Sequence, residues 1–339
     1  MITPRPDQNA PVNESISISP ARTSLRWQEL DIARGVALAA MVIYHAAWDL
    51  SFLNLITTEV VTDPAWRWFA RTIAGSFLFL SGIALVLAHR NGVRREAFLR
   101  RLVKIAGAAL TVTVVTFVVF PDSYIFFGIL HAIAASSVIA LPFLRSPYWL
   151  TLLVAGLFMT APWLLTSPAL DAPWLDWLGL GQAVPRTNDY IPIFPWTGLV
   201  LAGVAAARSP LITPRLMPSA TGATGVTTRW LAVAGRWSLP IYLVHQPILF
   251  GAFSALLAVT GPNPQAEARP FLRECQAGCL RANDNESVCR RTCQCMVESM
   301  RREGLWTDVL ADRLKPEDQT RVSRMAQQCL SRQPAGAPS

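Results

Sequence analysis

Apolar runs separated by short polar segments occupy most of this 339-residue chain. A helix rises about 1.5 Å per residue and the hydrocarbon core of a bilayer is about 30 Å thick, so an uncharged run of about 20 residues is typical of a transmembrane helix. The stretch 167–190 is interrupted by Pro168, Pro173 and Pro185, and we expect it to form an interfacial loop. The pattern therefore predicts an all-α polytopic membrane helix bundle with spans at residues 30–54, 68–88, 103–120, 124–143, 148–166, 191–207 and 238–260.

The composition supports a membrane protein. Hydrophobic residues make up 52% of the chain, charged residues only 15%, and the mean hydropathy is +0.33. A soluble domain carries about 25% charged residues, so this composition excludes a disordered chain and disfavours a soluble one. The net charge of +8 could indicate nucleic-acid binding, but the basic residues flank the predicted spans. The lipid bilayer is therefore the expected partner, and no nucleic acid is expected.

The distribution of charge and cysteine predicts three regions and an orientation. Residues 1–25 are expected to form a flexible cytoplasmic tail, residues 26–262 the transmembrane domain, and residues 263–339 a small helical tail that contains all six cysteines. Lys and Arg gather before the first span and after the second, fourth and sixth, and loops rich in these residues are cytoplasmic. Seven spans then place the C-terminal tail in the periplasm, outside an inner (plasma) membrane.

The cysteines of the tail predict disulfides. Two Cys-x3-Cys pairs each place both sulfurs on one helical face, and the link 281–287 between them is turn-like. An even number of cysteines outside the membrane fits an oxidising compartment. Zinc binding and reduced thiols are the alternatives, and a stabilising cap without chemistry is the expected role. Of the fifteen pairings that six cysteines allow, we favour Cys275–Cys293, Cys279–Cys289 and Cys295–Cys329.

The first span carries four polar residues on one side, namely Asp31, Arg34, His45 and Asp49. At about 100° per residue they fall within an arc of roughly 60°. Ionisable groups inside a membrane are costly and are candidates for function. A buried polar network that fixes helix packing is the alternative interpretation.

This stripe of residues suits acid–base chemistry at one end and anion binding at the other. Asp49, four residues after His45, is expected to accept a hydrogen bond from one imidazole nitrogen, which leaves the other nitrogen as a base. We therefore predict His45 and Asp49 as catalytic residues. Arg34, about 16 Å nearer the cytoplasm, can hold a phosphate bidentately, with Asp31 beside it. A long phosphorylated donor entering from the cytoplasm would fit this arrangement, and no metal site is expected.

Three further residues are predicted to line the donor site. His245 lies between Tyr242 and Pro247, and a proline frees a carbonyl one turn back and can kink the helix. His131 lies in the outer half of the fourth span. Arg236, at the cytoplasmic start of the last span, can meet a phosphate. For both histidines the alternative is a hydrogen-bonded core residue. For Arg236 the alternative is that it only reflects the excess of basic residues at the cytoplasmic ends of transmembrane helices.

Motifs in five of the spans resemble a known family. They are Leu30-Asp31-x-x-Arg34-Gly35 with Met41 and Tyr44-His45, then Phe79-Leu-Ser81-Gly82, Phe127-Gly128-Ile-Leu-His131, Pro195-Trp196-x-Gly198 and Gly235-Arg236-x-Ser238-Leu-Pro-Ile-Tyr242-Leu-Val-His245-Gln246-Pro247. In this order, over roughly residues 26–258, they resemble the heparan-alpha-glucosaminide N-acetyltransferase catalytic-domain family of transmembrane acyltransferases. At His45 the chain resembles the bacterial members, whereas lysosomal members carry Asn. The resemblance implies transfer of an acetyl or acyl group from cytoplasmic acetyl-CoA or another acyl-CoA, as co-substrate, to an acceptor on the far side.

An acyltransferase acting on an extracytoplasmic sugar or glycan is therefore the expected function. A transporter of a small solute or anion is one alternative, although transporters more often contain an internal repeat and none is visible here. A non-enzymatic scaffold with a partner-binding tail is the other. The sequence leaves the acceptor, the acyl chain length and a homodimeric state open.

Overall fold

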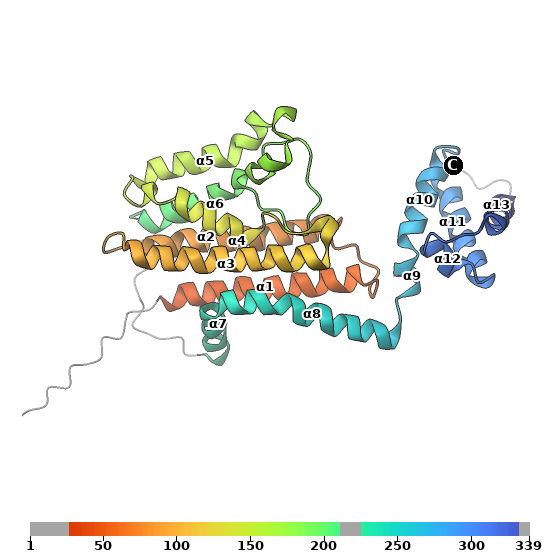
Figure 1. The fold of residues 1–339 in the computed structure, drawn as a ribbon, viewed down its shortest axis with the longest axis horizontal. Helices are drawn as coiled ribbons and strands as arrows, with labels where there is room; N and C mark the ends of the chain where they lie inside the picture. Colours follow the sequence, from red (N-terminus) through yellow and green to blue (C-terminus); the bar gives the residue numbers. More distant parts are fainter. Residues whose placement is uncertain (1–26, 211–224, 332–339) are drawn as a thin grey trace, which may run out of the picture.

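The computed structural model describes residues 27–210 and 225–331, and helices account for the regular structure of these ranges. Most helices of the first part run side by side along the long axis of the molecule (Figure 1). Their bounds are α1 (Gln28–Phe52), α2 (Pro64–Ala88), α3 (Arg95–Val119), α4 (Ile129–Ile139), α5 (Tyr148–Leu165), α6 (Ile193–Arg208), α7 (Val226–Arg236) and α8 (Ser238–Thr260). Short 3-10 turns join them at Pro121–Ser123, Pro142–Leu144, Pro168–Leu170 and Pro173–Leu178.

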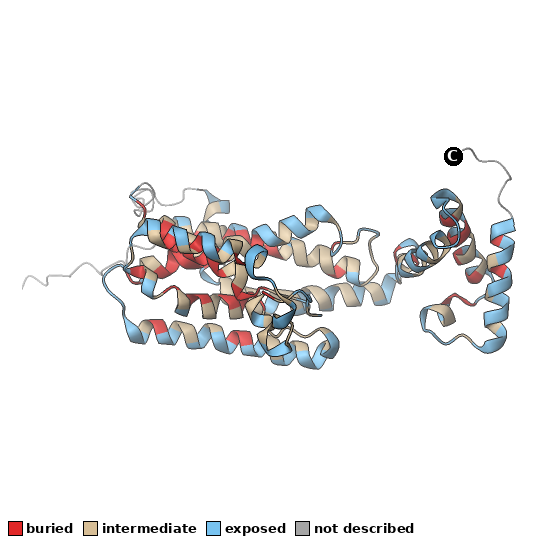
Figure 2. Ribbon diagram, turned by 90° about the horizontal axis from the view of Figure 1, so that it is seen from above, coloured by how far each residue is buried: buried red, intermediate tan, exposed pale blue. Residues whose placement is uncertain are grey.

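The first part is a helical membrane bundle, as the hydropathy pattern predicted. Within the described residues, five helices are long and apolar enough to cross a membrane, namely α1, α2, α3, α5 and α8. Two shorter apolar helices, α4 and α6, complete the bundle. Figure 2 shows that the buried residues lie between the helices, whereas the outer faces of the bundle are largely exposed.

The fourth predicted span, 124–143, is longer than the helix that forms. Helix α4 has only 11 residues, which corresponds to about 16 Å. The preceding residues are extended instead: Phe127 forms an isolated bridge with Tyr190, and the Ile191 amide donates to the Phe127 carbonyl over 3.1 Å. Hydropathy could not reveal this pairing, because an apolar residue is equally compatible with a helix and with an extended segment.

Helix α7 is a second difference from the hydropathy pattern, which predicted no helix there. It lies across the bundle axis at the end where α1 begins (Figure 1), and it packs on α1 at very short range. A Cβ atom on Gly235 would overlap the Asp31 carbonyl oxygen, and one on Gly35 would overlap the Leu231 carbonyl oxygen. The two backbones can approach this closely only because glycine stands at both positions.

The core of the bundle lies where α2, α4, α5 and α6 meet. Leu78, Leu85 and Leu201 are almost completely buried there. Gly82 faces the backbone of Val200 so closely that a side chain would not fit. This packing holds α2 closely against α6, and α1, α4 and α5 pack on this pair.

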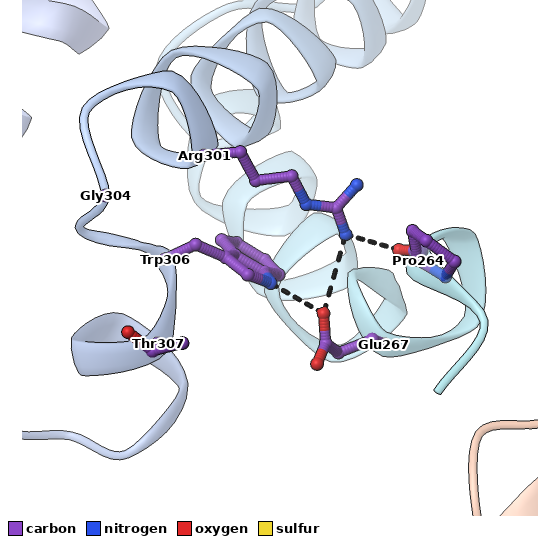
Figure 3. A pocket seen from close by; sticks show the side chains of 6 residues that line it. All are labelled: Pro264, Glu267, Arg301, Gly304, Trp306 and Thr307. Carbon is purple, nitrogen blue, oxygen red and sulfur yellow. Dashed lines mark hydrogen bonds and ion pairs between the residues drawn. The ribbon is translucent and has the colours of Figure 1, made fainter. Parts of the chain in front are cut away.

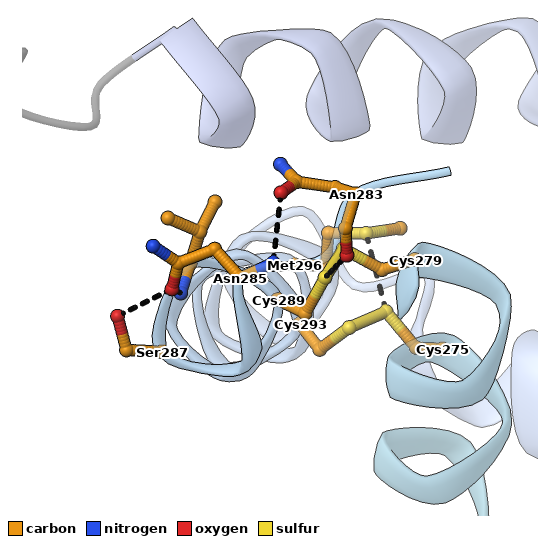
Figure 4. Close-up of a disulfide and its surroundings, with 9 residues drawn as sticks. Cys275, Cys279, Asn283, Asn285, Ser287, Cys289, Cys293 and Met296 are labelled. Carbon is orange, nitrogen blue, oxygen red and sulfur yellow. Dashed lines mark hydrogen bonds between the residues drawn. A yellow bond between two sulfur atoms is a disulfide. The ribbon is translucent and has the colours of Figure 1, made fainter. Parts of the chain in front are cut away.

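The tail consists of short helices stapled by disulfides, with bounds α9 (Pro264–Glu267), α10 (Arg269–Leu280), α11 (Glu286–Arg302), α12 (Trp306–Leu310) and α13 (Pro316–Ser331). Two bonds, Cys275–Cys293 and Cys279–Cys289, join α10 to α11 (Figure 4). The third, Cys295–Cys329, joins α11 to α13. The favoured cysteine pairing is therefore confirmed in full.

The tail contacts the loop between α1 and α2. The Asn263 amide donates to the Asn54 carbonyl over 2.9 Å, and Arg269 Nη1 donates to the Thr57 carbonyl over 2.9 Å. Arg273 forms an ion pair with Glu59 at 3.0 Å. The tail thus lies beyond the end of the bundle where α1 stops, which we call the tail end, and α7 lies at the opposite, α7 end (Figure 1).

Candidate active site

Two histidines meet inside the bundle. His45 in α1 and His245 in α8 lie with ring centroids 5.0 Å apart and an interplanar angle of 63°, in an edge-to-face arrangement. Tyr44 and Tyr242 flank the pair, at 5.5 Å from His45 and 5.7 Å from His245 respectively. Periodicity within one helix suggested His45, and only the packing of α8 against α1 places His245 beside it.

A hydrogen bond fixes the tautomer of His245. Its Nδ1 lies 2.6 Å from the Tyr242 carbonyl oxygen. A carbonyl oxygen can only accept, so Nδ1 carries the proton and Nε2 carries a lone pair. Nε2 is buried and has no hydrogen-bond partner among the described residues. His245 is therefore oriented to accept a hydrogen bond or a proton.

Asp49 has a different partner from the one that the sequence predicts. Its carboxylate is completely buried, and Oδ1 accepts a hydrogen bond from Nε2 of Gln246 at 2.7 Å. The expected bond to His45 within α1 is replaced by this bond to α8. Sequence reasoning missed Gln246, although a polar pair, His245-Gln246, inside an otherwise apolar run was a visible signal.

Three lone-pair atoms are left without a donor at this place. In the described part of the chain, Asp49 Oδ2, Gln246 Oε1 and His245 Nε2 are buried and have no partner. Most buried polar atoms in native proteins are hydrogen-bonded, and leaving one unpaired costs about 1–3 kcal/mol. All three atoms are acceptors, so each is suited to a group that donates a hydrogen bond, such as a hydroxyl, an amine or water.

A second group of predicted residues lies where α7 crosses α1. Asp31 is almost completely buried and lies 3.8 Å from the Arg34 guanidinium. The neighbouring Arg236 is exposed and donates through Nε to the Ala232 carbonyl at 3.3 Å. The structure thus brings Asp31, Arg34 and Arg236 to the α7 end, and about 16 Å along α1 separates Arg34 from His45.

His131 belongs to neither group. Its Nδ1 accepts from the Gly128 amide at 3.3 Å, so its Nε2 carries the proton and donates to Thr113 Oγ1 at 3.2 Å. Thr113 in turn donates to the Ile125 carbonyl at 2.7 Å. Both ring nitrogens are therefore engaged in a network that fixes the start of α4 against α3, which favours the structural interpretation of His131.

Asp189, in the segment before α6, supports the same helix start and was missed as well. Its carboxylate accepts from the Ile129 amide at 2.9 Å, and a Cβ atom on Gly128 would overlap it. Burial raises the pKa of Asp189 to about 6, and the Ile129 hydrogen bond opposes part of that shift. The sequence does not single out Asp189, because nothing in its neighbourhood predicts that it points inward.

Comparison with known families decides between the functional classes. The chain matches the family described as "Heparan-alpha-glucosaminide N-acetyltransferase, catalytic" over residues 26–247, which is more than half of its length. The chain belongs to this family. No curated protein and no solved structure matches it. The resemblance inferred from the motifs is thereby confirmed, and membership indicates a membrane acetyltransferase.

The family match coincides with the polar residues and excludes the tail. It contains His45, Asp49, His245 and Gln246, and it ends at Pro247 in the middle of α8. Within residues 27–210 and 225–331, no group of three or more His, Cys, Asp or Glu residues is placed to hold a metal ion. The candidate residues for the acetyltransferase reaction are therefore the two polar groups along α1, one around His45 and one around Arg34.

The tail contains an open pocket of about 490 Å³ (Figure 3). Glu267 Oε2 accepts from Trp306 Nε1 at 2.8 Å and pairs with Arg301 at 3.6 Å. The Arg301 guanidinium also lies over the Trp306 ring, 5.1 Å from its centroid. Because these side chains satisfy one another, the pocket is best explained as a gap beside a structural network of the tail.

Proposed function

We propose that this acetyltransferase moves an acetyl or acyl group from a cytoplasmic coenzyme A ester to a sugar or glycan acceptor on the extracytoplasmic side of the inner (plasma) membrane. The His45–His245 pair is the observation that carries the proposal. It lies inside the bundle, within the residues that match the family, and next to unpartnered acceptor atoms that suit an incoming hydroxyl or amine.

In the proposed reaction His45 acts as the general base. It takes the proton of the acceptor O–H or N–H as that atom attacks the thioester carbonyl; the new C–O or C–N bond forms, the C–S bond breaks, and the leaving thiolate takes up a proton. His245, with its Nε2 lone pair held by the bond to Tyr242, is the adjacent group to which His45 can pass the proton. The Asp49–Gln246 hydrogen bond holds α1 and α8 at the spacing that the pair needs.

The donor would bind from the α7 end. Arg34 and Arg236 supply guanidinium groups that can bind phosphate oxygens, and Asp31 orients Arg34 through their ion pair. The distance of about 16 Å along α1 from Arg34 to His45 suits a donor whose thioester lies far from its phosphates. The disulfide-linked tail at the other end supports an oxidising compartment there.

The test separates chemistry from donor binding in purified protein reconstituted in nanodiscs. We expect His45→Ala to lower the single-turnover rate of acyl transfer by about 10²–10⁴ while the affinity for the coenzyme A ester stays nearly constant. Arg34→Ala should instead weaken donor affinity, and Arg34→Lys should restore only part of it, because lysine lacks the planar fork of arginine.

His89→Ala is the matched control, because His89 is a histidine of the same bundle that follows α2 directly and whose Nδ1 donates to the Leu85 carbonyl of that helix. Its rate should equal that of the wild type. A folded His45→Ala protein with full activity would rule out the proposed base. Parallel loss of binding and rate in all variants would favour a purely structural polar network.

A further inference from the structure

Helix α7 has one face on the bundle and an opposite face that no described residue covers. Ala232 and Gly235 are buried against α1. On the other side, Val226 is 75% exposed and Trp230 is 70% exposed, and Trp237, directly after the helix, is 62% exposed. Large apolar side chains grouped on one exposed helix face mark a surface that is built for a partner.

The charges on α7 are all of one sign. The helix contains Arg229 and Arg236 and no acidic residue, and both arginines are exposed. At about 100° per residue, the two arginines fall on the same flank of the face that carries Val226 and Trp230. An apolar face rich in tryptophan and flanked by basic residues is typical of a helix that lies in the plane of a membrane interface.

The location of α7 matches that interpretation. It lies across the bundle axis, whereas the apolar helices run along it (Figure 1). It joins α8 directly through Trp237 and crosses the start of α1, so it lies at the level where these two spans begin. Tryptophan favours the headgroup region, because its ring is apolar and its N–H needs a polar partner.

We propose that α7 is an in-plane membrane helix that binds anionic phospholipid headgroups through Arg229 and Arg236, with Trp230 and Trp237 inserted between the lipids. The charge complementarity and the continuity with the apolar spans identify a lipid surface as the occupant. This surface adjoins the proposed donor site, where Arg236 is also assigned to a phosphate, so the charge contribution is tested at Arg229 alone. It also bears on α1, because Gly235 rests on the backbone of Asp31.

The test uses a fluorescent label at Trp230→Cys in the full chain, in phosphatidylcholine nanodiscs that contain a fixed fraction of brominated phosphatidylglycerol or of brominated phosphatidylcholine. All six native cysteines are in disulfides, so the label goes to the new thiol. We expect both brominated lipids to quench the label, and phosphatidylglycerol to quench it more. Leu310→Cys, an exposed apolar position in the tail, is the control and should not be quenched.

The charge contribution is tested in the same labelled protein. Arg229→Gln should lower the preference for phosphatidylglycerol about fivefold, as expected for one basic residue at an anionic surface, and Arg229→Lys should keep most of it. Equal quenching by the two lipids would overturn the binding of anionic headgroups. A label that neither lipid quenches would overturn the membrane interface altogether, and would indicate that a second copy or another protein segment covers α7.

Discussion

At the residue scale, the partner of Asp49 decides how the candidate site is held. The carboxylate is fully buried and bonds Gln246 across the α1–α8 interface. A hydrogen bond to a charged group contributes about 1.5–3 kcal/mol to stability. Removing the donor costs more than that contribution, because the buried acceptor then keeps its full desolvation penalty. We therefore expect Asp49 to act as a positioning residue for the two histidines, because its hydrogen bond goes to Gln246 and not to His45 as the sequence predicts.

Gln246→Ala should lower the stability of the protein by about 1–3 kcal/mol, because it leaves the Asp49 carboxylate buried without its donor. Gln265→Ala, an exposed glutamine in α9, is the control and should change stability by less than about 0.5 kcal/mol. Thermal unfolding in detergent measures both. In the double variant Asp49→Asn/Gln246→Ala the two losses should not add, whereas additive losses would contradict the pairing.

Asp189 should make stability depend on pH. Burial raises its pKa from the ordinary value of about 4 to about 6, so the folded protein disfavours the charged form. The protonated carboxyl favours the folded state, and this stabilisation is complete below about pH 4 and is lost as the pH rises through about 6. At about 1.4 kcal/mol per pKa unit, the free energy of unfolding falls by up to about 3 kcal/mol over this range.

Asp189→Asn keeps an oxygen acceptor for the Ile129 amide and removes the charge. Melting temperatures of wild type and variant should therefore converge near pH 4 and diverge toward pH 7, with the variant higher. Parallel curves over that range would show that the Asp189 carboxylate ionises freely in the folded state.

At the element scale, the crossing of α7 over α1 connects the proposed donor site with the helix face that we propose binds the membrane. The two helices touch through Gly35 and Gly235, so any side chain there separates them. Asp31 and Arg34 lie on the α1 side of this contact, and Arg236 follows Gly235 on the α7 side. The geometry of the predicted phosphate-binding residues thus depends on backbone contact between two helices.

Gly235→Ala should destabilise the protein by about 1–3 kcal/mol through overpacking and should weaken binding of the coenzyme A ester. Gly251→Ala is the matched control, because Gly251 lies in α8 with nothing within 4 Å of an added Cβ atom. The control should be neutral or slightly more stable, since alanine favours helix. Unchanged affinity for the coenzyme A ester in a folded Gly235→Ala protein would show that the proposed donor site does not depend on the contact between α7 and α1.

At the scale of the whole molecule, the tail and the α1–α2 loop share one end of the bundle. Asn263, Arg269 and Arg273 form the contacts that fix this arrangement. The tail has its own core, in which Met300 is completely buried, and three disulfides. Each disulfide closes a loop and contributes about 3 kcal/mol in the chain-entropy model. A cap of this kind can be stable on one side of the membrane regardless of the chemistry inside the bundle.

A reporter that is active only in the cytoplasm should be silent when fused after residue 339 and active when inserted after residue 95. The charge bias places the 89–94 turn inside, and the odd number of predicted crossings places the tail outside. Insertion into the α1–α2 loop should be silent too, because that loop touches the tail. Opposite signals from the loop and the tail would contradict the contacts between them.

Hydropathy and cysteine spacing determined the class of the fold, because apolar length and helical periodicity are local properties of a chain. They predicted the helical bundle and the disulfide pairs. The polar stripe of the first span predicted His45 and Arg34 as site residues, and the motifs identified the family. Only the tertiary structure decided which side chains meet. His245 lies beside His45, and Gln246 replaces the imidazole as the partner of Asp49, because two helices far apart in sequence pack together. Helix α7 shows the same limit, since its contact with α1 depends on two glycines 200 residues apart.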